Sequence, residues 1–457
     1  TPEWLKVLLA DGIGGGITTV STFIPPIFFL FLFLAMLEDS GYMARAAFVM
    51  DRVMRALGLP GKAFVPLIVG FGCNVPAIMA TRTMDKATDR IITIMMAPFM
   101  SCGARMPVYV LFATAFFPTN GQNLVFGIYV IGIIAAIITG FLIKRVVLPG
   151  EVSAFVMEIP PYHIPTVKGV MMRTWDRLKA FLNRAGKVIV VICAVLGFLN
   201  SWGTDGSFGN EDSEKSVLSE IGYTIAPVLS PMGVTQENWP AAVGVFTGIF
   251  AKEAVVGTLN SLYDQMARDK NAEAAGEGAA APAEEEADDG WSLGAILSEA
   301  GGTIVDNLAD LGGAFTDPLG IAVDDLSDTA SAAESQEVTV TTIDMMQKLF
   351  GSQLAAFAYL MLVLLYMPCV AAIAAVYREA GAAWTLFLAA WTTVLGYSTA
   401  TIVYRVGTFA QDPLYATVAI VISLGLLAAL LVFMRNYVKN NRGKGPKVIP
   451  IAVAQPS

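Results

Sequence analysis

Residues 70–77 read GFGCNVPA and lie inside an apolar run over 64–80 that is too short for a comfortable membrane span. The glycines loosen the backbone, Pro76 removes an amide donor, and the thiol of Cys73 lies beside the carboxamide of Asn74. Such breaks are tolerated at membrane depth where they face protein or a water-filled cavity. The stretch is therefore either a kink whose cysteine packs as a small apolar residue, or a discontinuous helix lining a permeation site.

The composition around this stretch is that of a helical membrane protein. Of the 457 residues, 55% are hydrophobic and only 15% are charged. Residues 40–57 interleave apolar side chains with three arginines and an aspartate, which predicts an amphipathic helix at the membrane interface. Runs long enough to cross a bilayer are 20–37, 91–117, 124–143, 185–202, 354–376, 384–404 and 414–434, and the shorter runs 64–80, 217–231 and 241–262 predict re-entrant or half-helices.

Charge is unevenly distributed along the chain. Residues 266–342 hold 17 acidic and 2 basic residues, so the acidic bias belongs to one polar loop. If residue 1 lies outside, the inner segments carry 21 Lys and Arg and the outer segments carry 6. Because cytoplasmic loops of membrane proteins are enriched in Lys and Arg, this predicts that residue 1 and the acidic loop face outward and that the C-terminus is cytoplasmic.

Two halves of the chain share one order of elements. A crossing is followed by a short helix, a broken run and further crossings, once from residue 20 and again from residue 185. The first half enters the membrane from outside and the second from inside, which is the pattern of an inverted-repeat transporter. The predicted fold class is all-α: a polytopic membrane protein with two inverted-topology repeats, re-entrant or discontinuous helices and one interfacial amphipathic helix.

Four places put thiols or charges at membrane depth, where an ionisable residue is costly and is a functional candidate by default. Cys193 lies in an unbroken apolar run and is predicted to pack as a small apolar residue. The candidate metal ligands are Cys73, Cys102 and Cys369, followed in rank by Asn74, Met106 and Glu253. The candidate backbone breaks are Gly70, Gly72, Pro76, Pro98, Pro107 and Pro368, and the charges at depth are Arg105 and Lys252.

Two of these assignments have ordinary alternatives. On a continuous helix Cys102 and Met106 share one face at i, i+4, although methionine is also common core filler. Lys252 and Glu253 either serve the path, neutralise each other or cap a loop.

The ligand types favour a borderline-to-soft transition-metal ion over Na⁺ or Mg²⁺. Sparse ligands from separate helices bind weakly enough for the ion to leave again, as conduction requires. The single histidine, His163, excludes a His-rich metal cage, a bis-histidine haem and an H-E-x-x-H protease. No catalytic centre and no nucleic-acid partner are predicted.

Five segments carry a family resemblance: LEDSGYMARAAF (37–48), GFGCNVPAIMATRT (70–83), APFMSCGAR (97–105), FTGIFAKEAVVGTLN (246–260) and LLYMPCVAA (364–372). They closely resemble ferrous iron transport protein B, FeoB, in order from about Phe23 to Tyr404. The resemblance implies Fe²⁺ uptake across the bacterial inner membrane, with paired Gate regions near 70–80 and 364–372 that are shared with nucleoside-transporter-like folds. By position it suggests Cys73, Cys102 and Cys369 along the iron path, and Glu253 less directly.

The chain departs from this family in lacking the N-terminal GTP-binding domain. Gly61-Lys62 has Ala56 in place of the first P-loop glycine and is followed by Ala63, so no G-x-x-x-x-G-K-[ST] motif occurs. The chain opens on Thr1, which indicates a processed protein or a fragment. It is therefore expected to be no enzyme by itself, with GTP and Mg²⁺ bound only through the missing domain. The expected partners are the lipid bilayer, that GTP-binding domain, small cytoplasmic accessory proteins and further copies of the chain.

The predicted division of the chain follows the repeats. Residues 1–123 form the first Gate-like half, 124–184 a connecting crossing and cytoplasmic linker, and 185–265 the first part of the second half. Residues 266–342 form the acidic, partly disordered outer loop, 343–438 the remaining membrane helices and 439–457 a cytoplasmic tail.

Other functions leave part of the pattern unexplained. A nucleoside transporter would need carboxamides and carboxylates for ribose hydroxyls rather than membrane thiols. An intramembrane enzyme or a cofactor-holding respiratory subunit lacks its catalytic pair or its histidines. A membrane scaffold leaves the three cysteines at backbone breaks without a role.

Overall fold

The computed structural model describes residues 7–118, 120–149, 161–211, 213–252, 254–275 and 339–440. These ranges are helical apart from short connections, and their β-type pairing is confined to two isolated bridges over 202–216. Six helical stretches are long and apolar enough to cross a membrane, which confirms the all-α polytopic class. They are Gly12–Asp39, Ala87–Phe116, Gly121–Val147, Gln353–Ala380, Ala382–Gly407 and Pro413–Asn440.

The run predicted as a crossing over 185–202 forms α10, Lys187–Ser201, of 15 residues, which is not among these six stretches. A π-helical turn, Leu182–Gly186, joins it without a break to the preceding helix, Val167–Phe181. It lies along α2, Gly15–Asp39, where a Cβ atom at Gly16 would stand 3.0 Å from the Val190 Cα atom. This close approach brings Cys193 against Gly16, in the packing role predicted for that cysteine.

The first half is built from helices of very different exposure. Helix α3, Tyr42–Ala56, buries Ala47, Asp51 and Met54 and exposes Phe48 and Val49, as an interfacial amphipathic helix requires. It bends by 106° into the segment Gly61–Gly72. The half then continues through α4 (Phe64–Gly72), α5 (Asn74–Ala80), α6 (Ala87–Met96), α7 (Met106–Phe116) and α8 (Gly121–Leu142).

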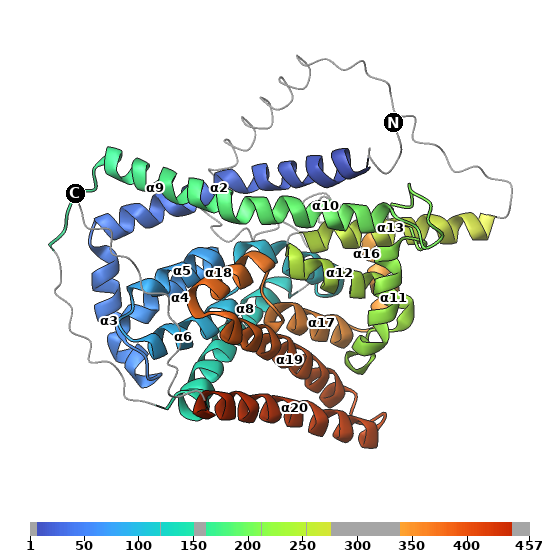
Figure 1. Ribbon diagram of the computed structural model, residues 1–457. Helices are drawn as coiled ribbons and strands as arrows, with labels where there is room; N and C mark the ends of the chain where they lie inside the picture. The colour runs from blue at the N-terminus through green and yellow to red at the C-terminus, as the bar shows by residue number, and fades with distance from the viewer. Residues whose placement is uncertain are drawn as a thin grey trace, which may run out of the picture.

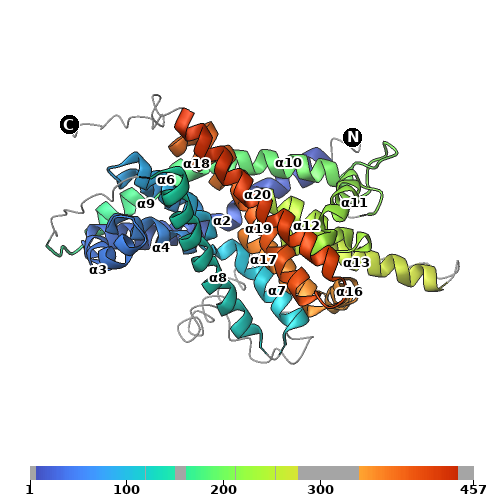
Figure 2. The same cartoon turned by 90° about the horizontal axis from the view of Figure 1, so that it is seen from below.

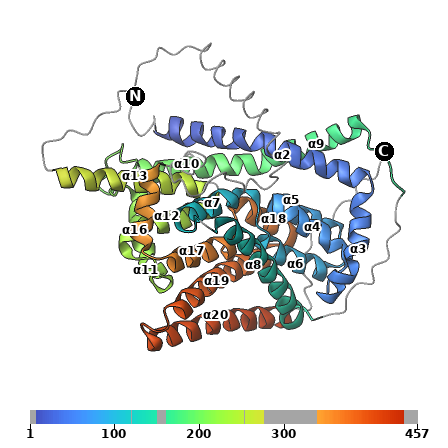
Figure 3. The same ribbon diagram turned by 180° about the vertical axis from the view of Figure 1, so that it is seen from behind.

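The second half repeats this order. After α9 (Val167–Phe181) come α10, α11 (Val217–Leu229), α12 (Trp239–Phe250), α13 (Ala254–Ala275), α16 (Val340–Phe350), α17 (Gln353–Leu365), α18 (Val370–Ala380), α19 (Ala382–Gly407) and α20 (Pro413–Asn440). Figure 1 and the view from behind in Figure 3 show α2 and α10 side by side along one edge and α20 along the opposite edge. The acidic segment over 276–338 and the tail over 441–457 lie outside the described residues.

The broken helices of the two halves correspond in detail. Cys73 after α4 and Ala251 after α12 are both extended, with φ and ψ of −154° and 131° and of −142° and 114°. In each, the amide donates to the carbonyl four residues earlier, at 3.0 Å. Helix α5 of the first half packs on α18 of the second, and α7 of the first half packs on α13 of the second. Such paired contacts between the halves are expected of two related repeats.

Helix α17 lies at the centre of the fold and α20 at its edge. Ten of the 13 residues of α17 are buried, whereas α20 buries only Ala416, Ser423 and Met434. Figure 2 shows α20 crossing the face of the molecule in front of α19. The apolar exposed side of α20 is suited to lipid rather than water.

Glycines let the two central breaks pack against the following helices. A Cβ atom at Gly132 in α8 would lie 2.7 Å from the Phe99 carbonyl oxygen, and one at Gly396 in α19 would lie 2.8 Å from the Tyr366 nitrogen. Gly396→Ala is therefore expected to lower the free energy of unfolding by about 1–3 kcal/mol, because the neighbouring atoms are backbone and cannot move aside.

Thermal unfolding of the detergent-solubilised protein measures this loss. Gly425→Ala in α20 is the matched control, since no atom lies within 4 Å of the added methyl position, and it should leave the melting temperature unchanged. Equal melting temperatures for both variants would contradict the close packing of α19 on the break.

Candidate functional site

The first break separates α4 from α5 at Cys73. Gly70 and Gly72 lie within α4, and Pro76 lies in the first turn of α5, where a missing N–H costs no hydrogen bond. The helix is interrupted at Cys73, which is extended and lies between Gly72, the last residue of α4, and Asn74, the first residue of α5. Asn74 begins α5 with 4% of its surface exposed, and its Oδ1 atom has no hydrogen-bond partner among the described residues.

The second break runs over 97–105 between α6 and α7. Pro98 lies in a 3-10 turn, Ala97–Phe99, and a second turn, Gly103–Arg105, leads into α7 with Pro107 in its first turn. Cys102 is extended, with φ −80° and ψ 159°, so the predicted i, i+4 helical pair of Cys102 and Met106 is wrong. The Met106 sulfur instead accepts a hydrogen bond from the Tyr129 hydroxyl at 3.7 Å.

Arg105 is a buried cation at the end of this break, with only 1% of its surface exposed. Its Nη1 atom donates to the Pro98 carbonyl at 3.2 Å, while Nε and Nη2 have no partner within the described ranges.

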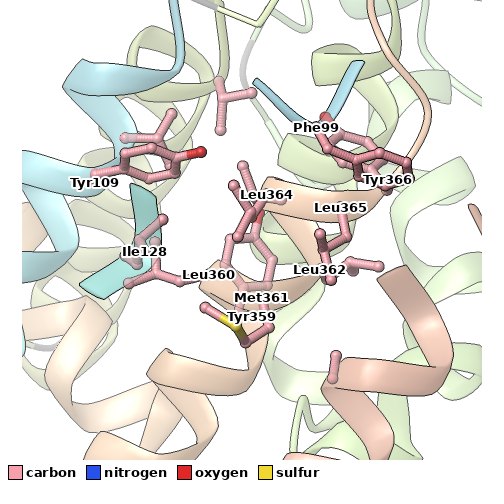
Figure 4. Close-up of a cluster of buried hydrophobic side chains, with 14 of the residues drawn as sticks. Phe99, Tyr109, Ile128, Tyr359, Leu360, Met361, Leu362, Leu364, Leu365 and Tyr366 are labelled. Carbon is pink, nitrogen blue, oxygen red and sulfur yellow. The ribbon is translucent and has the colours of Figure 1, made fainter. Parts of the chain in front are cut away.

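The third break, between α17 and α18, contains Pro368 and ends at Cys369. Tyr366 closes α17 by donating its amide to the Leu362 carbonyl at 2.8 Å, and Cys369 caps the start of α18. Figure 4 shows Phe99, Tyr109 and Tyr366 gathered with Leu364 and Leu365 at this end of α17.

The fourth break, between α12 and α13, brings a second cation to the same place. Lys252 is 2% exposed, and its Nζ atom lies 3.2 Å from the centre of the Tyr366 ring. Glu253, the acidic candidate ligand, lies outside the described residues.

The breaks pack against one another in pairs. A Cβ atom at Gly70 would lie 3.0 Å from the Met100 side chain, and one at Gly248 would collide with the Tyr366 hydroxyl. Gly70 thus fits the first break onto the second, and Gly248 fits the fourth onto the third. Phe71 and Tyr129 stack with centroids 6.1 Å apart, which adds an aromatic wall beside Met106. Spacing along the chain predicts none of these contacts, because each joins separate helices.

A cavity of about 520 Å³ opens beside two of the breaks. It lies between α2, α5, α9 and α18, and reaches Val75 and Ala371, two residues beyond Cys73 and Cys369 respectively. The walls are mostly apolar. The charged residues that line it are Glu38, Arg82, Asp176, Arg177, Arg378 and Glu379.

Glu379 forms a buried ion cluster at this cavity. Its Oε1 atom accepts from Arg82 Nε at 2.7 Å, and its Oε2 atom pairs with Arg90. The Glu379 side chain is 2% exposed and that of Arg90 7%. Sequence reasoning missed this cluster, since Glu379 lies near a loop and 289 residues from Arg90.

No group of three or more His, Cys, Asp or Glu side chains close enough to hold a metal ion occurs in the part of the chain that the structure describes. The thiols of Cys73, Cys102 and Cys369 are each partly exposed and come from separate breaks.

Broken central helices with thiols and buried cations at their meeting point define a polytopic membrane protein of the discontinuous-helix class. The family model described as "Nucleoside recognition", named Gate, matches residues 20–116 and 182–383, and the model "Ferrous iron transport protein B C terminus" matches 125–177. The chain belongs to the Gate family and corresponds to the membrane part of FeoB.

The curated relatives agree with this assignment. The Fe(2+) transporter FeoB of Salmonella typhimurium is 44% identical over 435 residues, covering 95% of this chain and 54% of the relative. The Fe(2+) transporter FeoB of Legionella pneumophila strain Lens is 46% identical, covering 94% and 55%. The chain spans about half the length of these relatives. No solved structure matches it.

Proposed function

We propose that this chain is the membrane permease of a bacterial ferrous iron transporter. The observation that carries the proposal is that Cys73, Cys102 and Cys369 each stand at a helix break, and that the elements on either side of these breaks pack against one another across the two halves. Thiols from both repeats at such breaks suit a borderline-to-soft ion such as Fe²⁺. The name of the relatives, Fe(2+) transporter, supports the choice of ion.

The proposal gives each candidate ligand within the described residues a place on the path. Cys102 and Cys369 flank the meeting point of the breaks, and Cys73 with the buried Asn74 Oδ1 atom lies at the first break. The Met106 sulfur, beside the Tyr129 hydroxyl, is a weaker candidate ligand than the three thiols. On a path of this kind the ion contacts few ligands at a time, so it is bound weakly enough to be released.

We place the cavity beside α5 and α18 at the cytoplasmic end of the path. The basic residues that line it, Arg82, Arg177 and Arg378, belong to segments that the positive-inside rule assigns to the cytoplasm. Residue 1 and the acidic loop over 266–342 then face outward from the inner membrane, and the C-terminus faces inward. In this proposal the transporter consists of two Gate-like halves, one over 1–123 and the other over 185–265 and 343–438. The linker 124–184 joins them, and the tail 439–457 follows the second half.

Energy would come from outside this chain. A GTP-binding domain with Mg²⁺, small cytoplasmic accessory proteins and association between copies are the partners that we propose for the longer transporter. This sequence contains no G-x-x-x-x-G-K-[ST] motif, so we assign GTP binding to that further domain.

Cysteine substitutions test the proposed path. Cys102→Ser and Cys369→Ser are each expected to reduce ferrous uptake by iron-starved cells carrying the intact protein at least about tenfold, since a lost metal contact costs that much or more. Cys73→Ser should act in the same direction.

Cys193→Ser is the matched control, because Cys193 packs against Gly16 away from the breaks, and uptake should remain at the wild-type level. Wild-type uptake in all four variants would end the thiol-path proposal. Equal loss in Cys193→Ser would assign the effect to general destabilisation.

A further inference from the structure

The cavity between α2, α5, α9 and α18 has one apolar end and one charged end. Three of the segments that line it each contribute an apolar residue and, about two helical turns further along, a charged residue. These pairs are Phe31 and Glu38, Val75 and Arg82, and Ala371 and Arg378. The continuous helix of α9 and α10 lines the cavity in the opposite order, from Arg177 to Val188. Charged side chains therefore gather at one end.

This charged end lies at the level of the membrane surface. Helix α2 ends at Asp39, and the interfacial helix α3 begins three residues later at Tyr42 (Figure 1). Glu38, in the last turn of α2, lines the charged end. The apolar end lies toward the helix breaks, but neither Cys73 nor Cys369 is among the described residues that line the cavity. An apolar interior with a charged opening at the surface matches a lipid molecule, with its chain inside and its headgroup outside.

One side of the charged end carries an excess of positive charge. The Glu379 carboxylate is shared between Arg82 and Arg90, so two guanidinium groups face one carboxylate. Arg378, the residue before Glu379, is exposed and forms no ion pair with any described residue. A guanidinium group presents N–H donors in a fixed fork that matches the oxygens of a phosphate. This side of the opening is therefore suited to a phosphate group.

The opposite side, formed by α2 and α9, carries an excess of negative charge. Glu38 pairs with Arg177 at 2.6 Å, whereas the neighbouring Asp176 is exposed and forms no ion pair within the described ranges. A headgroup with negative charge alone would be repelled by this carboxylate, while a primary ammonium group would pair with it. A headgroup that carries both a phosphate and an ammonium group complements both sides.

We propose that this cavity binds one zwitterionic phospholipid with a primary ammonium group, the chemistry of phosphatidylethanolamine. An acyl chain lies among Phe31, Val75 and Ala371, the phosphate lies at Arg378 and the ammonium group at Asp176. The volume of about 520 Å³ is within the usual range of ligand pockets, and burial of the chain supplies a hydrophobic driving force. The inference does not rest on the transported ion, because the thiols proposed for the ion path do not line this cavity.

A lipid titration tests the site. The intact protein, stripped of lipid in detergent, is titrated with phosphatidylethanolamine, phosphatidylglycerol or phosphatidylcholine of identical acyl chains, and native mass spectrometry measures the fraction with one bound lipid. Phosphatidylethanolamine should bind at least about tenfold more tightly, because phosphatidylglycerol lacks the ammonium group and the choline nitrogen has no N–H to donate. Tighter binding of phosphatidylglycerol would overturn the zwitterionic assignment. Equal binding of all three would show lipid that covers the surface without a specific site.

Variants assign the two halves of the headgroup. Asp176→Asn should reduce phosphatidylethanolamine binding to the level of phosphatidylglycerol, whereas Arg378→Gln should weaken all three lipids about tenfold, since each carries the phosphate. Both residues are exposed, so the variants should fold, and their melting temperatures without lipid should equal that of the wild type.

Two further variants complete the test. Ala374→Leu narrows the apolar part of the cavity from α18 and should weaken all three lipids without changing the headgroup preference. Arg435→Gln removes an exposed arginine of α20, outside the cavity, and should bind lipid as the wild type does. Wild-type lipid binding in Asp176→Asn, Arg378→Gln and Ala374→Leu alike would overturn the inference.

Discussion

Replacing Glu379 by glutamine is expected to lower the free energy of unfolding by about 3–5 kcal/mol, because a buried ion pair that loses one partner leaves an uncompensated charge. Glu379 pairs with Arg82 and Arg90, and both Glu379 and Arg90 are buried. The glutamine amide would direct an N–H group at a guanidinium. The Arg82 side chain is 41% exposed and regains water, so most of the cost falls on Arg90.

Glu38→Gln is the matched control for this prediction. Glu38 also lines the cavity and pairs with Arg177 at 2.6 Å, but both side chains are about one-third exposed. An ion pair of that exposure contributes about 0–1 kcal/mol. Chemical or thermal unfolding in detergent should therefore separate the two variants clearly. Equal stability would show that the Glu379 cluster is not the buried link between the 3-10 turn Thr81–Thr83, α6 and α18.

Tyr359→Ala is expected to have an effect of similar size, about 3–5 kcal/mol, because truncating a buried aromatic side chain leaves a cavity. Tyr359 is fully buried in α17 and stacks on Phe112 of α7 with centroids 5.1 Å apart. Its hydroxyl donates to the Ala241 carbonyl of α12 at 3.0 Å. One side chain thus joins helices of both halves.

Two controls divide the Tyr359 effect into its parts. Tyr359→Phe keeps the ring and loses one hydrogen bond, so about 1 kcal/mol is expected. Tyr377→Ala removes a tyrosine of α18 that is 58% exposed and should change stability by less than about 0.5 kcal/mol. Unfolding of all three variants in the same detergent measures the series, and a Tyr359→Ala variant as stable as Tyr377→Ala would contradict the central position of α17.

The site illustrates which features the sequence predicts. Cys73, Cys102 and Cys369 stand at breaks in both the sequence pattern and the structure. The prediction that Cys102 and Met106 share one helix face is wrong, because Cys102 is extended. It lies between two 3-10 turns, so it is not in the same helix as Met106.

The sequence by itself determined the membrane class, the positions of most crossings and the places where helices are interrupted, because these depend on local hydrophobicity, helix length and residues such as proline. Only the tertiary structure decided that α10 lies along α2, that Lys252 lies over the Tyr366 ring, and that Glu379 joins Arg82 and Arg90 across 297 and 289 residues. Such contacts depend on how finished helices pack, through glycines such as Gly248 and Gly396 that admit a neighbouring backbone or ring. That packing is a property of pairs of distant segments, which no local pattern encodes.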